Sequence, residues 1–204
     1  MQSCADNLVY TGTDIEVVLT GNTYKAAFTE SSPVSTFNSG NQILLNASGS
    51  LQIDNRILTY MDNQWKAENE FSWSDLTGKT NVTAVYPVYP DLDYVQENLY
   101  KNNSLEDILY VKDEFPAGNS IHLQFKHLFS LLTLHLEGNL QTYFQKIEVT
   151  CPAVSSIIPK SAEIVLADNG THTTTIAQVS PSGNYSFIVP PVGNMVIAIN
   201  MVTN

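Results

Sequence analysis

Aromatic side chains are the groups in this sequence that could bind a ligand most directly. One cluster contains Trp65 and Trp73, and a second cluster contains Tyr94 and Tyr100. An exposed aromatic ring can stack on the apolar face of a sugar, as in lectin-like sites. Most such rings instead pack in the core or at the rim of a sandwich. The sequence therefore favours packing for these four residues and keeps glycan contact as the alternative.

The sequence contains no pattern of residues that is typical of a catalytic centre. There is no G-x-S-x-G, H-E-x-x-H, G-x-x-x-x-G-K-[ST], G-x-G-x-x-G or C-x-x-C motif, and these motifs position nucleophiles, zinc, phosphates and dinucleotides. The residues beside Cys151, which are Thr150 and Pro152, give no sign of a thiol activated by histidine. We therefore predict that the protein is not an enzyme and that it needs no cofactor.

Histidines, acidic residues and cysteines also form no metal-binding pattern. His122 and His127 have opposite strand parity and no carboxylate at ligand spacing, so we expect His127 to be half-buried and hydrogen-bonded. The acidic segment 91–97 lacks the Gly and the terminal Glu of an EF-hand, which indicates a solvated loop. Cys4 and Cys151 are too few for a zinc site or a disulfide framework. We predict no metal, and a bridge between the two cysteines stays open.

Net charge argues against a nucleic-acid partner. The formal charge is −11 and the pI is about 4.5, so the protein would repel a phosphate backbone or an anionic membrane surface. Its 9 Lys and Arg residues are scattered rather than clustered. The sequence contains no run of about 18 apolar residues, so it predicts no transmembrane segment. The chain also lacks the charged start and apolar stretch of a signal peptide, so if the protein is exported, we expect this to be a mature or trimmed form.

Composition predicts an all-β fold. The 204 residues, of which 43% are hydrophobic, suffice for one sizeable sandwich or at most two small domains packed together, and we predict a single domain over residues 1–204. Only 14% of the residues are charged, while Thr, Ser, Asn, Val and Ile are abundant, which suits half-buried strands joined by polar turns. Frequent short strands between turn signals predict an antiparallel Greek-key sandwich.

Three short turn signals predict β-hairpins. Ser48-Gly49-Ser50 and Asp62-Asn63 each separate two apolar stretches. Asp168-Asn169-Gly170 is the strongest of these signals, and it lies between strand candidates at 163–167 and 173–177. The sequence therefore predicts a tight turn at each of the three positions.

Other segments give weaker indications. Residues 80–89 alternate as a strand until Pro87, which lacks an N–H and predicts an edge, a bulge or an exit. Residues 104–107 could cap a single helical turn. Residues 195–202 form a last apolar strand that ends without a closing turn, so we expect the chain to be truncated there.

The stretch from residue 121 to residue 136 changes the face on which its apolar residues lie. Ile121, Leu123 and Phe125 share one parity, whereas the leucines within 132–136 share the other. An unbroken strand would expose one of the two sets. We therefore predict a bulge or bend within residues 126–131 that lets both halves face one core.

Six short motifs occur in a recognisable order. They are F-N-S-G-N-Q-I at 37–43, Y-M-D-N-Q-W at 60–65, A-V-Y-P at 84–87, L-E-D-I-L-Y at 105–110, L-Q-F-K-H-L at 123–128 and Y-S-F-I-V-P-P at 185–191. Together they resemble the N-terminal domain of the fimbrillin (Mfa-like) family of Bacteroidales-type surface fimbriae. The resemblance covers roughly residues 8–202, and its specificity comes from the order of the motifs. Asn41 stands where the family usually has Asp.

The resemblance implies a transthyretin-like sandwich that is exported as a lipoprotein to the cell surface, in the outer membrane or a fimbrium. Ser3-Cys4 resembles the end of a lipobox, which makes Cys4 the lipidation candidate. In the family a protease removes the N-terminal strand after an Arg, and a strand of a neighbouring subunit fills the groove. The residues that would carry this strand exchange are Leu8, Tyr10, Ile15, Val17 and Leu19. Arg56 is the sole Arg, but it lies well inside the chain, and we do not expect cleavage there.

Our sequence-based hypothesis is a non-enzymatic fimbrial subunit, or a tip or anchor component, that serves adhesion. Its partners would be other fimbrial subunits and a ligand on a host or bacterial surface. The alternative is a glycan-binding surface lipoprotein module of the same fold. The second domain of a full fimbrillin has no counterpart in the sequence, which leaves open a trimmed form or a shortened accessory subunit.

Overall fold

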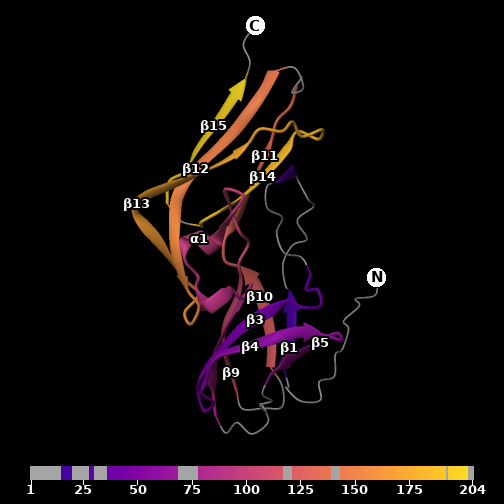
Figure 1. Ribbon diagram of the computed structural model, residues 1–204, viewed down its shortest axis with the longest axis vertical. Helices are drawn as coiled ribbons and strands as arrows, with labels where there is room; N and C mark the ends of the chain where they lie inside the picture. The colour runs from indigo at the N-terminus through magenta and orange to yellow at the C-terminus, as the bar shows by residue number, and fades with distance from the viewer. Residues whose placement is uncertain are drawn as a thin grey trace.

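The computed structural model describes residues 15–19, 28–29, 36–68, 78–116, 121–138, 143–191 and 193–201. Nearly all of its regular structure is β-strand (Figure 1), which confirms the predicted all-β sandwich. The strands are β1 (Ile15–Leu19), β2 (Phe28–Thr29), β3 (Gln42–Gly49), β4 (Ile53–Met61), β5 (Gln64–Ala67), β6 (Thr80–Tyr86), β7 (Tyr100–Lys101), β8 (Ser104–Leu105), β9 (Leu109–Phe115), β10 (Ile121–His127), β11 (Ser130–His135), β12 (Phe144–Ile158), β13 (Glu163–Ile176), β14 (Asn184–Val189) and β15 (Val196–Met201). A short 3-10 helix (Pro90–Leu92) and helix α1 (Gln96–Leu99) lie between β6 and β7.

The largest sheet has seven strands in the order β1-β10-β9-β6-β3-β4-β5. Strands β3, β4 and β5 follow one another as antiparallel neighbours, and β6 returns to pair with β3. This order is that of a Greek key, as the sequence predicted. Strand β1 joins the sheet parallel to β10. The two edge strands β1 and β5 contact each other, so the sheet curls back on itself.

The inner face of the curled sheet encloses the first hydrophobic core. Strand β10 alternates in burial, and its residues Ile121, Leu123 and Phe125 point into this core. Trp65 lies in the same core, with Phe37 in edge-to-face contact at a centroid distance of 4.9 Å. The period of two in the strands therefore sets which side chains fill the sheet.

A second, smaller sandwich lies at the end of the molecule where the chain finishes (Figure 1). It consists of a sheet with the order β11-β14-β2 and a sheet with the order β13-β12-β15. The buried side chains between them come from β12, β13 and β14, and they are Phe144, Ile147, Val149, Cys151, Ile176, Tyr185, Phe187 and Val189. The apolar faces of the two small sheets thus cover each other.

A middle core joins the two ends of the molecule. Strands β12 and β13 are long enough to extend from the small sandwich to the outer face of the seven-stranded sheet (Figure 1). Leu44 of β3 and Val85 of β6 point outward and meet Val154 and Ile157 of β12 there. Because the two ends share this core, we propose that the chain folds as one unit.

The predicted bend within residues 126–131 is confirmed. Strand β10 ends at His127, β11 begins at Ser130, and Leu128 and Phe129 between them are buried. The expectation that both halves face one core was wrong. Ile121 packs in the first core, whereas Leu132 packs against the core of the small sandwich. The change of parity therefore marks a strand that passes from one sheet to another.

Two of the three predicted hairpin turns are confirmed. Strand β3 pairs with β4 through a turn at residues 50–52, which begins at Ser50 just after Ser48 and Gly49 at the end of β3, and β4 pairs with β5 so that Met61 faces Gln64. Asp62 and Asn63 have φ values of 53° and 59°. A two-residue type I′ turn requires this left-handed conformation at both central positions, and Asp and Asn adopt it readily.

The hairpin turn predicted at Asp168-Asn169-Gly170 was wrong. Strand β13 runs through these residues, and the chain reverses at 159–162 instead. Pairing with β12 shifts from Val154↔Leu166 to Pro152↔Thr171, so the tripeptide lies in a bulge. Asn169 has a φ of 53° there, and a left-handed residue suits a bulge as well as a turn. The local signal was correct, but the longer pairing of β12 with β13 decided the structure.

Residues 104–107 do not form the predicted helical turn. Ser104 and Leu105 instead pair with β7 across Asn102-Asn103, and the helix α1 lies in the segment expected to be a loop. Both asparagines are left-handed, with φ values of 49° and 62°, which again fits a two-residue turn. The strand predicted before Pro87 and the last apolar strand are confirmed as β6 and β15.

The shared middle core predicts cooperative unfolding. We expect the denaturant transitions followed by tryptophan fluorescence and by far-UV circular dichroism to coincide, as they do for a two-state unit. Leu44→Ala should lower the free energy of unfolding by about 2–5 kcal/mol, because the side chain is fully buried between the two ends. Val196→Ala at an exposed position should change it by less than about 0.5 kcal/mol. Two separate transitions in the unsubstituted chain would show that the ends unfold independently.

Candidate functional site: sheet edges and a polar cleft

Strand β1 is an edge strand on which most of β10 depends for backbone pairing. Its five residues pair in parallel with β10, from Ile15↔Ile121 to Leu19↔Phe125. On the other side of β10, strand β9 pairs with Lys126 and His127. Loss of β1 would therefore remove the ladder along residues 121–125 and open that side of β10 to another strand.

The edge beneath β1 has an apolar inner face. Ile121, Leu123 and Phe125 are at most 1% exposed in the described structure. Because β1 also contacts β5, its removal would open the curled sheet between β10 and β5. The opening would have the two features that strand addition uses, which are a free backbone edge and apolar side chains on one face.

The predicted strand-exchange residues are only partly described. Ile15, Val17 and Leu19 belong to β1. Leu8, Tyr10 and the lipidation candidate Cys4 lie outside the described residues. Arg56 lies in β4 and pairs with Leu45 of β3, so a protease that needs an extended free segment would first have to break this pairing. This position agrees with our expectation that cleavage does not occur there.

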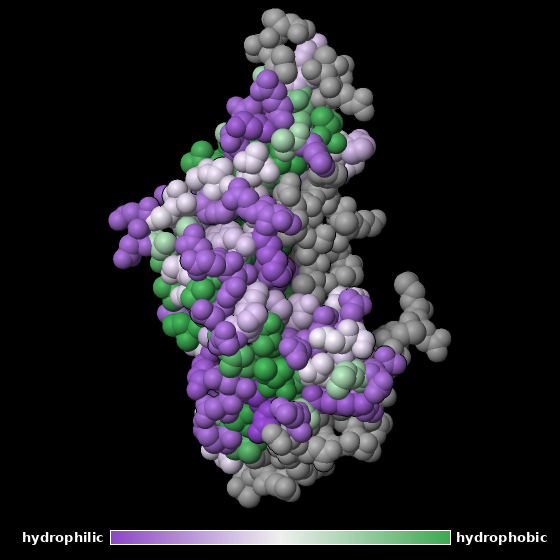
Figure 2. Space-filling view, in the orientation of Figure 1, coloured by the Kyte–Doolittle hydropathy of each residue, from purple (hydrophilic) through white to green (hydrophobic). Residues whose placement is uncertain are grey.

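Strand β15 is a second edge, and it exposes apolar side chains. It pairs with β12 and ends the order β13-β12-β15. Val196, Ile197 and Ile199 are 65%, 41% and 45% exposed, so side chains of both parities are accessible. Figure 2 shows hydrophobic side chains at the surface of this end of the molecule. Exposed apolar edges of this kind invite pairing with another strand.

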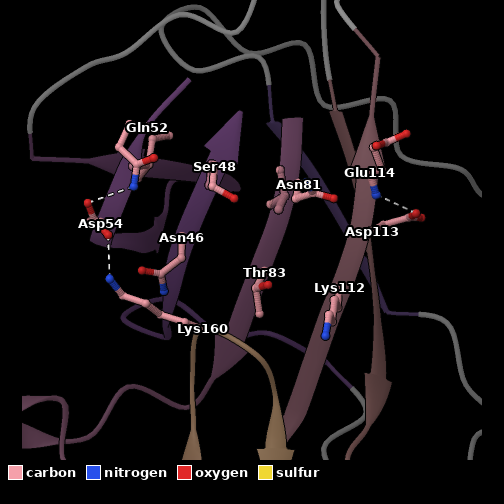
Figure 3. A pocket seen from close by; sticks show the side chains of 13 residues that line it. Asn46, Ser48, Gln52, Asp54, Asn81, Thr83, Lys112, Asp113, Glu114 and Lys160 are labelled. Carbon is pink, nitrogen blue, oxygen red and sulfur yellow. Dashed lines mark hydrogen bonds and ion pairs between the residues drawn. The ribbon is translucent and has the colours of Figure 1, made fainter. Parts of the chain in front are cut away.

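A polar cleft lies on the outer face of the seven-stranded sheet (Figure 3). Its volume is about 530 Å³, which is within the usual range for sites that bind small molecules. The pairing of Asn46 with Thr83, and of Thr83 with Lys112, places these three side chains in one row across β3, β6 and β9. The next row along the same strands is Ser48, Asn81 and Glu114.

The turn between β12 and β13 forms one wall of the cleft. Lys160 in this turn donates a hydrogen bond of 2.6 Å to Asp54 Oδ1, and Lys112 Nζ lies 3.4 Å from the carbonyl oxygen of Ser161. The hydrogen bond from Lys160, followed by one from Gln52, holds the pKa of Asp54 below its ordinary value. Asp54 and Lys160 are exposed, so their ion pair contributes little stability.

One buried amide in the lining of the cleft has a donor without a partner among the described residues. Asn46 is 6% exposed, and its Oδ1 accepts a hydrogen bond of 2.9 Å from the backbone N–H of Asn55. Within the described residues, its Nδ2 has no hydrogen-bond partner. Buried donors are nearly always paired, so this Nδ2 is an exception among the described residues.

Two of the aromatic residues predicted as alternative glycan contacts are buried. Trp65 and Tyr94 are each 2% exposed, and the Tyr94 hydroxyl donates a hydrogen bond of 2.8 Å to the carbonyl oxygen of Pro87. Burial raises the pKa of Tyr94. A sugar needs an exposed ring face, so the alternative of glycan contact is wrong for these two residues.

The other two predicted aromatic contacts have different outcomes. Tyr100 is half-buried, its hydroxyl oxygen accepts a hydrogen bond of 3.0 Å from the Val154 N–H, and its ring lies 4.0 Å from that of His172. Trp73 lies outside the described residues. Nearby, Tyr89 donates a hydrogen bond of 2.5 Å to Glu106, and burial followed by this bond raises the pKa of Tyr89. Through these hydrogen bonds the tyrosines fix the connection between β6 and β9, and they do not form an exposed aromatic face.

His127 has the role that the sequence predicted. Its Nδ1 lies 2.8 Å from Oδ2 of Asp107, and the two side chains are 19% and 4% exposed. The pair fixes the end of β10 just before the bend that leads to β11. Nothing in the sequence marked Asp107 as the partner, because the two residues meet only when β9 and β10 are paired.

The remaining predicted residues show no further site. Cys151 is a free, buried thiol whose pKa is raised by burial, and Cys4 lies outside the described residues. Among the residues that the structure describes, no group of three or more histidine, cysteine, aspartate or glutamate side chains could hold a metal ion. No helix in the same part of the chain is long and apolar enough to span a membrane.

Comparison with known proteins finds similar structures but no match by sequence. The chain matches no family model and no curated protein. It is similar to a crystal structure of a candidate cell adhesion protein from Bacteroides uniformis, with a TM-score of 0.55 and 12% identity over 80% of this chain and 74% of that chain. A second similar structure, a candidate cell adhesion protein from Bacteroides ovatus, has a TM-score of 0.50 and 12% identity over 95% of this chain and 79% of that chain. These similarities establish the fold.

The geometry of the His127–Asp107 pair predicts a measurable loss of stability when the pair is broken. His127→Ala should lower the free energy of unfolding by about 1–3 kcal/mol, because the carboxylate of Asp107 stays buried. His135→Ala is the matched control, since the side chain of His135 is 54% exposed, and it should have little effect. Chemical denaturation of the three proteins measures the difference. Equal losses for the two variants would contradict a specific role for His127.

Proposed function

We propose that this protein is a non-enzymatic cell-surface adhesion protein of the fimbrillin type that assembles by β-strand exchange. The observation that carries the proposal is the position of β1, an edge strand that pairs with residues 121–125 of β10 and contacts β5. The fold of the two similar Bacteroides structures is consistent with it. The resemblance of the sequence motifs to fimbrillins is the reason for proposing that type of adhesion protein.

The direction of pairing favours exchange. Strand β1 is parallel to β10, and parallel pairing is slightly less stable per residue than antiparallel pairing. A strand from another subunit that entered antiparallel would restore the backbone hydrogen bonds of residues 121–125 with better geometry. Removal of β1 followed by such an entry therefore replaces a weaker ladder with a stronger one.

Strand β15 is our candidate for the incoming strand. Its six residues, Val196–Met201, match the length of the five-residue β1. Its apolar side chains are exposed, so transfer into a groove would bury surface that is in water in the single chain. The partner of this reaction would be a second fimbrial subunit, identical or accessory.

We further propose that the protein is anchored at the cell surface by a lipid on Cys4, as the lipobox-like Ser3-Cys4 pair suggests. The anchor would place the chain in the outer membrane or at the base of a fimbrium, whereas a subunit that loses β1 would also lose Cys4. Anchor and stalk roles are therefore distinguished by whether the N-terminal segment is kept. A ligand on a host or bacterial surface would complete the adhesive role.

Controlled removal of β1 tests strand exchange. A specific protease site inserted between β1 and β2, in residues 20–27, allows cleavage of the folded chain. We expect the cleaved protein, followed by size-exclusion chromatography with light scattering, to form a series of masses that persist as ladders in SDS. The uncleaved protein should stay monomeric, because β1 fills the groove.

Substitutions on β15 provide the matched comparison. Ile197→Lys with Ile199→Lys should abolish the ladder without lowering the stability of the uncleaved chain by more than about 1 kcal/mol, since both side chains are exposed. Val165→Lys, at an exposed position on β13, should leave the ladder intact. A cleaved chain that stays folded and monomeric would contradict assembly by this route.

A further inference from the structure

On the outer face of the seven-stranded sheet, the side chains of three neighbouring strands change from apolar to polar at the same level. Leu44 of β3 pairs with Val85 of β6, which pairs with Tyr110 of β9, and this apolar row lies under the β12–β13 hairpin. The next two rows along the same strands are polar, Asn46-Thr83-Lys112 and Ser48-Asn81-Glu114. The polar rows form the floor of the cleft in Figure 3.

Two of the polar side chains in the floor are buried, and one of them is held in a fixed position. Asn46 and Thr83 are 6% and 7% exposed, so these two polar side chains are held within the sheet surface. The backbone N–H of Asn55 fixes the carboxamide of Asn46 through Oδ1. Within the described residues the Nδ2 donor of Asn46 has no partner, and leaving a buried donor unpaired costs free energy. A ligand that brings an acceptor oxygen to this amide would recover that cost.

The wall of the cleft is also held in place. Lys160 is paired with Asp54, and Lys112 reaches the carbonyl oxygen of Ser161 in the same turn. These contacts connect the β12–β13 turn to β4 and β9 on opposite sides of the floor. The cleft therefore presents a fixed set of side chains before any ligand binds, which lowers the entropic cost of binding.

The chemistry of the lining selects the class of ligand. Amide and ammonium donors at Asn46 and Lys112 alternate with carboxylate acceptors at Asp54 and Glu114. Sugar hydroxyl groups both donate and accept hydrogen bonds, so they match such a mixed lining. The cleft carries Lys112 and Lys160 against Asp54, Asp113 and Glu114, and the whole chain carries a net charge of −11. An anionic ligand is disfavoured by this balance.

We infer that the cleft over β3, β6 and β9 is a binding site for a neutral saccharide unit, with Asn46 Nδ2 donating to a sugar oxygen. Thr83 and Lys112 contact the same unit from the neighbouring strands, and the Lys160 turn closes one side. The site differs from the aromatic cluster that the sequence suggested for glycans, and it does not depend on strand exchange. It remains complete in the intact single chain, with β1 in place.

The test uses the intact monomer and a panel of neutral mono- and disaccharides, together with the corresponding uronic acids. Binding is measured by amide chemical-shift changes in ¹H–¹⁵N NMR spectra and by isothermal titration calorimetry. We expect at least one neutral sugar to shift the amides of residues 46–48 and 81–83 at millimolar concentration. Because the experiment requires no cleavage, its result is independent of the strand-exchange proposal.

Two variants separate a specific site from a general surface effect. Asn46→Asp keeps the acceptor for Asn55 but replaces the Nδ2 donor by an oxygen, and Thr83→Val removes the neighbouring hydroxyl. Each should weaken binding by about tenfold or more, the equivalent of one lost hydrogen bond. Thr171→Val, at an exposed position on β13, should leave binding unchanged.

The results that would overturn the inference are equally specific. Absence of binding by every neutral sugar would remove it, as would binding that both cleft variants leave unchanged. Binding by the uronic acids alone would show that the cleft selects anions, and the assignment to neutral sugars would then be wrong. Thermal unfolding of the variants, compared with the unsubstituted chain, shows that a lost signal does not come from a lost fold.

Discussion

The covering of one sheet face by the β12–β13 hairpin is the constraint on which the rest of the structure depends. A sheet whose inner face encloses a core still has an outer face, and apolar residues there need a second layer. Leu44 and Val85 receive that layer from Val154 and Ile157. Where the hairpin ends, at Lys160, the outer face turns polar. One hairpin thus decides the middle core, the connection between the two ends and the boundary of the cleft.

The same principle applies to the sheet edges, which are the parts of the molecule where another strand could pair. Strands β3, β6 and β9 have paired neighbours on both sides, whereas β10 relies on β1 for residues 121–125. A short, parallel edge strand such as β1 is held mainly by backbone hydrogen bonds. Another strand could make the same hydrogen bonds in its place. Strand β15 is an edge of a different kind. Its apolar side chains are exposed in the described structure, so no other element packs over them there.

Much of the fold could be predicted from local sequence patterns. The alternation of Ile121, Leu123 and Phe125 revealed a core face, and Asp62-Asn63 revealed a turn, because both depend on neighbouring residues alone. The bulge at Asn169 looked like a turn, since the same left-handed conformation serves both. The cleft was not predictable in this way. Its rows join residues about 30 or more positions apart, and cross-strand register comes from pairing that no local pattern records.

The two proposed functions occupy different parts of the same sheet. The cleft lies over β3, β4, β6 and β9, whose mutual pairing does not involve β1. Exchange of β1 for another strand changes the pairing of β10 and leaves those ladders in place. Every subunit of an assembled fibre would therefore present the same cleft. Repetition of a weak site along such a fibre would raise its avidity without any new contact, because each bound cleft holds the neighbouring clefts close to the same surface.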